Sequence, residues 1–386
     1  MQASDFTEDA PGDLVRNMSG DLAFVPRTLP PTVNWTNDVV VAMNEAESAL
    51  GKLSGIGKRF PQPERLIRLF LRREAELSSR IENTFAGVRT QLLFHFVSKV
   101  RMKAPDVQEV DNNFRALRFG LKAIESRPVS QSLIREMHQV LLRNVRGQDE
   151  TPGVYRKVQA HIGRSANIQE ARFVPAPPHL VPDCMENLER FIRENVEVPR
   201  LARLAMIHYQ FEAIHPFADG NGRIGRVLIL LMMCQTGLLP LPLFNPSASL
   251  EADRSKYYDH LLNVSQRGTW GPWIAFFARG VTAECGHATR RIEALEKLRL
   301  RYQKKIRTSR TSAKLTQLVD ELFGQPRVIL EDVQKMLDVW PQSAQRFIDR
   351  LIDLKILREV SGAKRNRVYL AHEIVGLFET GDPRDH

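Results

Sequence analysis

The chain has 386 residues, of which 43% are hydrophobic and 26% charged. This composition is ordinary for globular proteins and excludes wholesale disorder. At about 150 residues per domain, the length predicts two or three domains. Lys and Arg number 55 against 45 Asp and Glu, a formal net charge of +10. Such a basic balance indicates a polyanionic partner, either nucleic acid or a nucleotide polyphosphate.

Three further features exclude a disulfide scaffold, a zinc domain, a secreted protein and a membrane protein. Cys184, Cys234 and Cys285 are odd in number and far apart. The apolar run at 227–234 is far shorter than the roughly 20 residues of a membrane span. The N-terminus, MQASDFTEDAPGD, is acidic where a signal peptide is basic and then apolar. We therefore expect a soluble, cytoplasmic protein with no membrane partner.

The first part of the chain combines polar, extended and helical segments. Residues 1–20 are polar and predict a mobile leader, and FVPRTLPP after them predicts an extended segment. Residues 21–105 form the predicted N-terminal helical region, with helices from about residue 37 and over 63–84.

Residues 106–285 predict a second, larger helical unit. Helical periodicity recurs at about 106–124, 130–145, 200–214, 223–236, 254–266 and 271–283. Between them, TPGVYRKVQAHIG has the alternation of a short strand or hairpin. The fold class is therefore mainly α with one small β element.

The C-terminal part begins with a basic connector helix over 286–310, followed by 311–378 and a tail over 379–386. The order helix, helix, turn, helix and hairpin in 311–378 predicts a winged helix-turn-helix. Its recognition helix would cover 341–354, with Lys364, Arg365 and Arg367 on the wing. A protein that regulates by binding DNA is thus one hypothesis; a protein-interaction module of the same fold is the alternative.

The charge distribution gives the DNA-binding hypothesis little support from the winged helix itself. Residues 290–310 hold nine basic and two acidic residues, a net +7, whereas residues 311–386 hold eleven basic and twelve acidic residues, a net −1. The excess charge therefore lies mainly in the connector.

The densest chemistry lies in HPFADGNGRIGR, residues 215–226. Pro216 ends the preceding helix, and the turn at 220–222 opens the next one. A glycine turn at a helix N-terminus binds anions, because free N–H groups and the helix dipole point to one place. Arg223 and Arg226, three residues apart, can hold two phosphates.

Two further side chains complete a site for phosphoryl or nucleotidyl transfer. Asp219 is a hard oxygen ligand suited to a magnesium ion carried by a polyphosphate. His215 is a base of suitable pKa. A dinucleotide-binding or kinase loop would require a strand before the glycines, and here a helix precedes them.

Other readings of this region are structural. His208, Glu212 and His215 could together ligate a metal, but we favour structural hydrogen bonds for His208 and Glu212. Phe217 is interpreted as a buried anchor.

HPFADGNGRIGR matches the Fic family signature H-x-F-x-[DE]-G-N-G-R-x-x-R at every specified position. The resemblance runs from about residue 24 to residue 280. It implies a Fic-type helical core with a β-hairpin flap. It also implies AMPylation, the transfer of AMP from ATP to a Ser, Thr or Tyr hydroxyl of a target protein with release of pyrophosphate.

The resemblance also implies a role for each motif residue. His215 would be the general base, Asp219 would bind Mg²⁺, and Arg223 and Arg226 would hold the β- and γ-phosphates. Tyr257 would lie near the adenine. The rest of the ATP site would comprise Gly220, Asn221, Gly222, Ile224 and Gly225, and the target-binding flap would comprise Ile162, Gly163, Phe173, Val174 and Pro175. Glycine rather than lysine at 222 favours AMP transfer over phosphorylation.

A second motif resembles the Fic inhibitory pattern [ST]-x-x-x-E-[GN], with Ser78, Glu82 and Asn83 at its specified positions. The resemblance implies a salt bridge from Glu82 to Arg226, which would occupy the partner of the γ-phosphate and add a like charge there. We therefore expect an autoinhibited enzyme. Removal of AMP from a modified protein is the alternative direction, and self-modification and a homodimer stay open.

Overall fold

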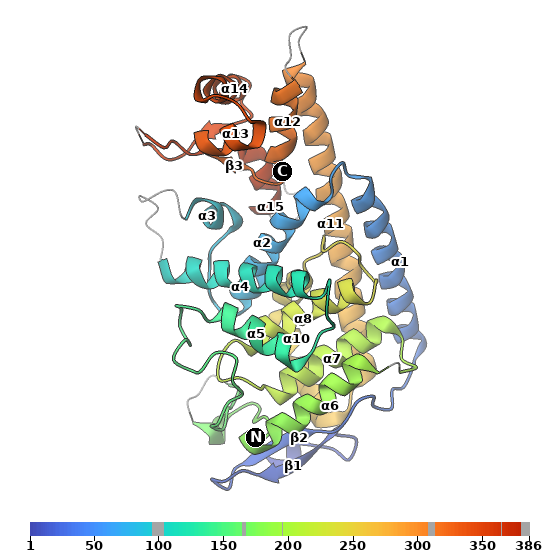
Figure 1. Ribbon diagram of the computed structural model, residues 1–386. Helices are drawn as coiled ribbons and strands as arrows, with labels where there is room; N and C mark the ends of the chain where they lie inside the picture. The colour runs from blue at the N-terminus through green and yellow to red at the C-terminus, as the bar shows by residue number, and fades with distance from the viewer. Residues whose placement is uncertain (95–103, 164–166, 195, 308–312, 364, 380–386) are drawn as a thin grey trace.

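The computed structural model describes residues 1–94, 104–163, 167–194, 196–307, 313–363 and 365–379. These residues are mainly helical, with one two-stranded and one three-stranded antiparallel sheet. Figure 1 shows a central group of helices, with the N-terminal hairpin at one end of the molecule and the C-terminal helices at the other.

Along the chain, ten α-helices follow the N-terminal hairpin and precede the long helix α11, which is described below. They are α1 (Asn37–Arg59), α2 (Glu64–Ile81), α3 (Val88–Leu93), α4 (Ala104–Ala123), α5 (Gln131–Leu141), α6 (Val181–Arg193), α7 (Arg200–Ile214), α8 (Asn221–Gln235), α9 (Pro246–Ala252) and α10 (Arg254–Arg267). Short 3-10 helices cover Ala3–Asp5, Ile168–Glu170 and Pro178–Leu180. Thr36 and Ser130 begin α1 and α5 because their hydroxyls accept hydrogen bonds from free N–H groups of the first turn.

The N-terminal segment is not a mobile leader. Strand β1 (Gly12–Arg16) pairs antiparallel with β2 (Leu22–Pro26). Phe24 is fully buried and donates its N–H to the Val174 carbonyl at 2.9 Å. The polar composition of residues 1–20 hides this strand, because only one face of the hairpin meets the rest of the protein.

The predicted hairpin between residues 151 and 180 is reduced to one isolated bridge in the described part of this segment. Ile162 and Phe173 exchange hydrogen bonds of 2.8 Å and 3.1 Å. The 3-10 turn at 168–170 follows Ile162, and Pro175, Pro177 and Pro178 cannot donate to a ladder. The flap is therefore a bridged loop.

Helix α11 (Trp270–Ile306) joins two helices that the sequence predicts as separate, at 271–283 and 286–310. Its buried stripe recurs every seven residues: Ile274, Val281, Ala288, Leu295 and Tyr302. Helix α1 packs along it (Figure 1). The boundary predicted at residue 285 thus falls inside one continuous helix.

The C-terminal part contains the helices and the hairpin that its sequence predicts, and one further strand and one further helix. It comprises α12 (Ala313–Leu322), β3 (Arg327–Val328), α13 (Leu330–Leu337), α14 (Pro341–Asp353), β4 (Arg358–Glu359), β5 (Tyr369–Leu370) and α15 (His372–Glu379), with strand order β3-β5-β4. Lys364 and the tail after residue 379 lie outside the described residues. In the ranges above, no helix has both the length and the apolar content needed to cross a membrane.

The C-terminal part packs on α2 and on the segment before it. Phe70 meets Phe378 edge-on, with ring centres 5.4 Å apart, and Phe60 lies 6.2 Å from Phe323. Arg65 forms a 2.8 Å ion pair with Glu321. Helix α2 therefore contacts the C-terminal part through its first half and, as shown next, the signature motif through its last turn.

Candidate active site

The signature motif begins where α7 ends. His215 follows Ile214 as the C-cap, with a left-handed backbone (φ 51°, ψ 61°) that a non-glycine residue adopts at a cost. Its side chain is half-buried, and Nδ1 has no hydrogen-bond partner within the described structure. Burial and the nearby Arg156 charge lower the pKa of His215 to about 4, so the imidazole is neutral at pH 7 and can accept a proton.

The turn before α8 has the backbone geometry of an anion cradle. Gly220 is the N-cap and has a left-handed backbone (φ 77°) that favours glycine. The Asn221 side chain fixes the turn, because its oxygen and nitrogen bond the main chain of Phe217, each at 2.8 Å. The first N–H groups of the 15-residue helix α8 are thereby held together at the positive end of its dipole. Phe217 is fully buried, as predicted.

The two motif arginines are buried and face different acidic partners. Arg223 lies 3.6 Å from Glu109 on α4 and 3.4 Å from Asp219. Arg226 is 1% exposed and turns toward α2. Both side chains start from the first two turns of α8, the helix that carries the anion cradle.

Arg226 is held by Ser78 in the last turn of α2 and by Glu82 directly after that helix. Its Nε donates to Ser78 Oγ at 2.9 Å, and its Nη2 donates to the Ser78 carbonyl at 3.0 Å and to Glu82 Oε1 at 2.7 Å. The predicted ion pair between Glu82 and Arg226 is therefore present. Burial alone would raise the pKa of Glu82, but the Arg226 charge outweighs it, and the pKa lies below its ordinary value.

Helix α2 ends immediately before Glu82, which explains the placement of its carboxylate. Glu82 is the C-cap, and Asn83 has a left-handed backbone (φ 60°). The Asn83 side-chain oxygen accepts a 3.0 Å bond from Arg254 at the start of α10. This turn is thus anchored on both sides of Glu82.

Asp219 offers one carboxylate for a divalent cation. Its Oδ1 accepts the Gly220 N–H at 2.6 Å, and its side chain is 34% exposed. Across the described ranges, no cluster of three or more His, Cys, Asp or Glu side chains is arranged to hold a metal. A single carboxylate fits Mg²⁺ that takes its remaining oxygen ligands from a polyphosphate and water.

His208, Glu212 and Tyr257, which the sequence analysis singled out, are packed among other residues of the protein interior. His208 uses both ring nitrogens, on the Gly225 carbonyl at 3.1 Å and on the Tyr257 hydroxyl at 2.9 Å, which confirms its predicted structural role. Tyr257 is 1% exposed and lies inside the core beside His208. Burial raises the pKa of Glu212 to about 7.

The flap residues divide into two groups. Phe173, Val174 and Pro175 are buried, with Phe173 against Phe24 of the N-terminal hairpin. Their side chains therefore pack inside the protein and support the flap. Ile162 and Gly163 are the more exposed members of the predicted set.

Two buried residues that sequence reasoning missed hold the motif loop in place. His138 on α5 bonds the Asp219 carbonyl through Nε2 at 2.9 Å, accepts the Gly153 N–H at 2.8 Å and stacks on Phe217. Arg156 donates to the His215 carbonyl at 2.8 Å. Nothing in their residue types or spacing distinguishes them from ordinary helix and loop residues.

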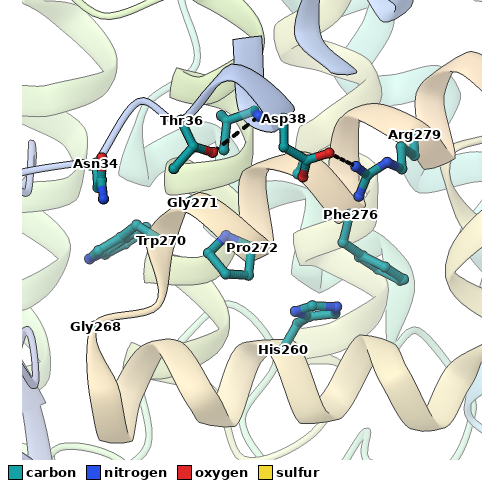
Figure 2. Close-up of a pocket in the computed structure, with 12 residues that line it drawn as sticks. Asn34, Thr36, Asp38, His260, Gly268, Trp270, Gly271, Pro272, Phe276 and Arg279 are labelled. Atoms are coloured by element: carbon teal, nitrogen blue, oxygen red, sulfur yellow. Dashed lines mark hydrogen bonds and ion pairs between the residues drawn. The ribbon is translucent and has the colours of Figure 1, made fainter. Parts of the chain in front are cut away.

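A cavity of about 540 Å³ lies apart from this site, and its lining includes no residue of either motif. Figure 2 shows that it lies where the starts of α1 and α11 meet α10, with Asp38 and Arg279 joined by an ion pair at its edge. The signature motif is therefore the better candidate for an active site.

Known proteins resemble the chain across the same region. Residues 40–122 match the Fic/DOC family N-terminal region, and residues 128–233 match the Fic/DOC family. A probable protein adenylyltransferase of Aquifex aeolicus is 30% identical over 156 residues, 39% of this chain and 46% of that protein. The protein adenylyltransferase fic-1 of Caenorhabditis elegans is 28% identical over 176 residues, 45% of this chain and 31% of that protein. The chain thus spans less than half the length of these curated relatives.

Two solved structures share the fold. A Fic family protein from Desulfovibrio desulfuricans G20 covers 89% of this chain and 98% of its own, with a TM-score of 0.57 and 21% identity. Residues 134–508 of Fic-1 from C. elegans cover 67% of this chain and 73% of their own, with a TM-score of 0.52 and 20% identity. The two family matches show a Fic/DOC domain over residues 128–233 preceded by a Fic/DOC N-terminal region over residues 40–122, and the curated relatives show that the chain is homologous to protein adenylyltransferases.

Proposed function

We propose that the protein is an autoinhibited adenylyltransferase that transfers AMP from ATP to a hydroxyl group of a protein. The observation that carries this proposal is the placement of a neutral base, His215, at the end of α7, one turn of chain before the anion cradle of α8. The names of the homologous proteins specify the same reaction.

The proposed chemistry uses residues of this chain for proton transfer and for charge stabilisation. His215 takes the proton from the target hydroxyl as its oxygen attacks the α-phosphorus of ATP. The bond from that phosphorus to the β-phosphate oxygen breaks, and pyrophosphate leaves. N–H groups at the start of α8, with Arg223, would stabilise the negative charge on the phosphates.

Asp219 would hold a magnesium ion that enters with ATP. When bound, the ion would neutralise phosphate charge. The single exposed carboxylate and its position before the cradle support this assignment.

Autoinhibition follows from the three bonds between α2 and Arg226. A γ-phosphate would need the guanidinium that Glu82 occupies, and the carboxylate would repel it. ATP bound beside Glu82 would be displaced from the attack geometry, and a displacement of about 1 Å costs on the order of 100-fold in rate.

The experiment is incubation with Mg²⁺ and ATP labelled at the α-phosphate, with the protein alone and with a total cell lysate. Glu82→Gly should label far more strongly than the wild type, and adding His215→Ala should abolish the label. A parallel reaction with γ-labelled ATP is the control for phosphorylation. Label from the γ-position only, or no label with Glu82→Gly, would refute the proposal.

We also propose that residues 313–379 form a winged helix-turn-helix with α14 as its recognition helix. The helix order and the antiparallel strands β4 and β5 around Arg365 and Arg367 support it. A gel shift with the full chain at low salt tests DNA binding; absence of a salt-dependent shift would favour a protein-binding role.

A further inference from the structure

We propose that Arg156 is a positioning residue for the base of the transfer reaction, holding the left-handed turn at His215 against the flap. This inference rests on the proposed function. Arg156 lies in the loop between α5 and the flap and is 4% exposed. Neither the signature motif nor the inhibitory motif includes it.

The guanidinium of Arg156 binds four main-chain carbonyls from three segments. Its Nε donates to the His215 carbonyl at 2.8 Å, and its Nη2 donates to the Ile214 carbonyl at 3.4 Å. Nη2 also donates to the Ala176 carbonyl in the flap, and Nη1 to the Val158 carbonyl at 3.2 Å. One planar group thus ties the end of α7 to both sides of the flap.

The backbone of Arg156 adds a fifth contact. Its N–H donates to the Pro216 carbonyl at 2.9 Å, so three consecutive carbonyls, at 214, 215 and 216, all accept from one residue. The preceding Tyr155 packs on Phe217, with ring centres 5.5 Å apart. The segment therefore contacts every residue from the end of α7 to Phe217.

The end of α7 needs such a partner for two reasons. The last carbonyls of a helix have no N–H partners within the helix, and a cation there also opposes the negative end of the dipole. In addition, His215 adopts the left-handed backbone at a cost, so the turn persists only where its surroundings hold it. The direction of the His215 side chain depends on that turn, and proton transfer depends on that direction.

A lysine cannot replace this arrangement. Its single ammonium group can keep the charge, but it lacks the planar fork that reaches carbonyls on both sides. Arg156→Met removes both the charge and the hydrogen-bond donors, whereas Arg156→Lys keeps the charge and removes only the planar guanidinium. Comparing the two variants separates these effects.

Arg203 provides a matched control. It also donates to main-chain carbonyls at a helix end, those of Phe191, Ile192 and Glu194 at the end of α6, and its hydrogen bonds go to no residue of the motif. Arg203→Met removes a similar set of bonds from a different place.

The variants are compared in the Glu82→Gly background by the initial rate of self-labelling from α-labelled ATP over a range of ATP concentrations. We expect Arg156→Met to lower kcat by about 30-fold or more, with the KM for ATP changed by less than about threefold, because the α8 cradle is untouched. Arg156→Lys should recover part of kcat, and Arg203→Met should keep it.

The inference is overturned if folded Arg156→Met keeps kcat, or if Arg203→Met reproduces its loss. Equal losses of kcat and ATP affinity would also overturn it, because they indicate general disruption. If Arg156→Met does not fold, Arg156→Lys decides, and an unchanged kcat refutes the role. Failure of the proposed function is distinct, because the Glu82→Gly parent would then label neither itself nor any protein of the lysate.

Discussion

Gly222 and Glu82 lie in direct contact across the start of α8. A β-carbon on Gly222 would stand 2.5 Å from Glu82 Oε1 and 2.9 Å from Arg226 Nη1. The absent side chain therefore makes room for the carboxylate, in the place where the proposed reaction needs room for phosphate. Glu82 and the end of a triphosphate exclude one another by space as well as by charge.

This contact predicts that the two variants Glu82→Gln and Glu82→Gly release the inhibition to different extents. Glu82→Gln keeps the volume and removes the charge, whereas Glu82→Gly removes both. We expect self-labelling from α-labelled ATP to rise about tenfold or more with glycine and to a level between wild type and glycine with glutamine. If glutamine labels as strongly as glycine, charge alone causes the inhibition.

The pH dependence of the released variant should reflect the low pKa of its base. His215 has a pKa of about 4, set by burial and by Arg156, while Glu82 and Asp219 act in the opposite direction. Removing Glu82 therefore cannot raise it. The Glu82→Gly rate should stay nearly constant from about pH 8 to about pH 5.5, where a histidine of ordinary pKa, about 6.5, would lose most of its activity.

The inhibition itself should not respond to pH in that range. The folded pKa of Glu82 lies below its ordinary value of 4.5, so the ion pair contributes stability above that value and loses it only as pH falls through the lowered folded pKa. Wild-type labelling should thus stay low from about pH 8 to about pH 5.5. A rise in wild-type activity near pH 6 would contradict this assignment.

His138 should matter for stability and for its pH dependence. Burial lowers its pKa to about 4, so the folded protein holds it neutral while the unfolded chain protonates it near 6.5. Its contribution is complete above pH 6.5 and declines as pH falls toward 4, by up to about 1.4 kcal/mol per pH unit.

His138→Phe keeps the ring on Phe217 but leaves the Asp219 carbonyl and the Gly153 N–H without this partner. We expect a loss of about 2–4 kcal/mol in the free energy of unfolding at pH 7 and a shallower slope toward acid, measured by urea unfolding. If the free energy of unfolding falls with pH as steeply in His138→Phe as in the wild type, another group causes that pH dependence.

The N-terminal hairpin should hold the flap in place. Phe24→Ala removes a fully buried ring that packs on Phe173, and such truncations cost about 3–5 kcal/mol. Hydrogen exchange at residues 171–175 should accelerate in this variant. Met18→Ala, at a fully exposed position of the hairpin turn, is the control and should leave exchange there unchanged.

The site was predictable from sequence where its function depends on local spacing. The cradle at Gly220, the end of α7 shortly before Pro216 and the Glu82–Arg226 pair all follow from short motifs whose residues are close in sequence or match a specific pattern. The helices around them follow from the periodicity of their apolar residues.

Other parts required the tertiary structure. The polar composition around β1 predicts mobility, because the burial of Phe24, which joins the hairpin to the rest of the protein, depends on partners about 150 residues away. The burial of Tyr257 depends on His208, and the role of Arg156 depends on carbonyls, which no side-chain pattern reveals. The predicted division at residue 285 fails because a change from apolar to charged composition does not interrupt a helix whose buried stripe continues.

The uninterrupted buried stripe on α11 has a consequence for how the protein unfolds. Ile274 and Ala288 lie in the same buried row of α11 as Tyr302. Loosening the C-terminal end of α11 therefore removes packing from the helix that also supports α1. The described parts of the chain should therefore melt in a single cooperative transition, and a fragment ending at residue 285 would sever the element that both ends share.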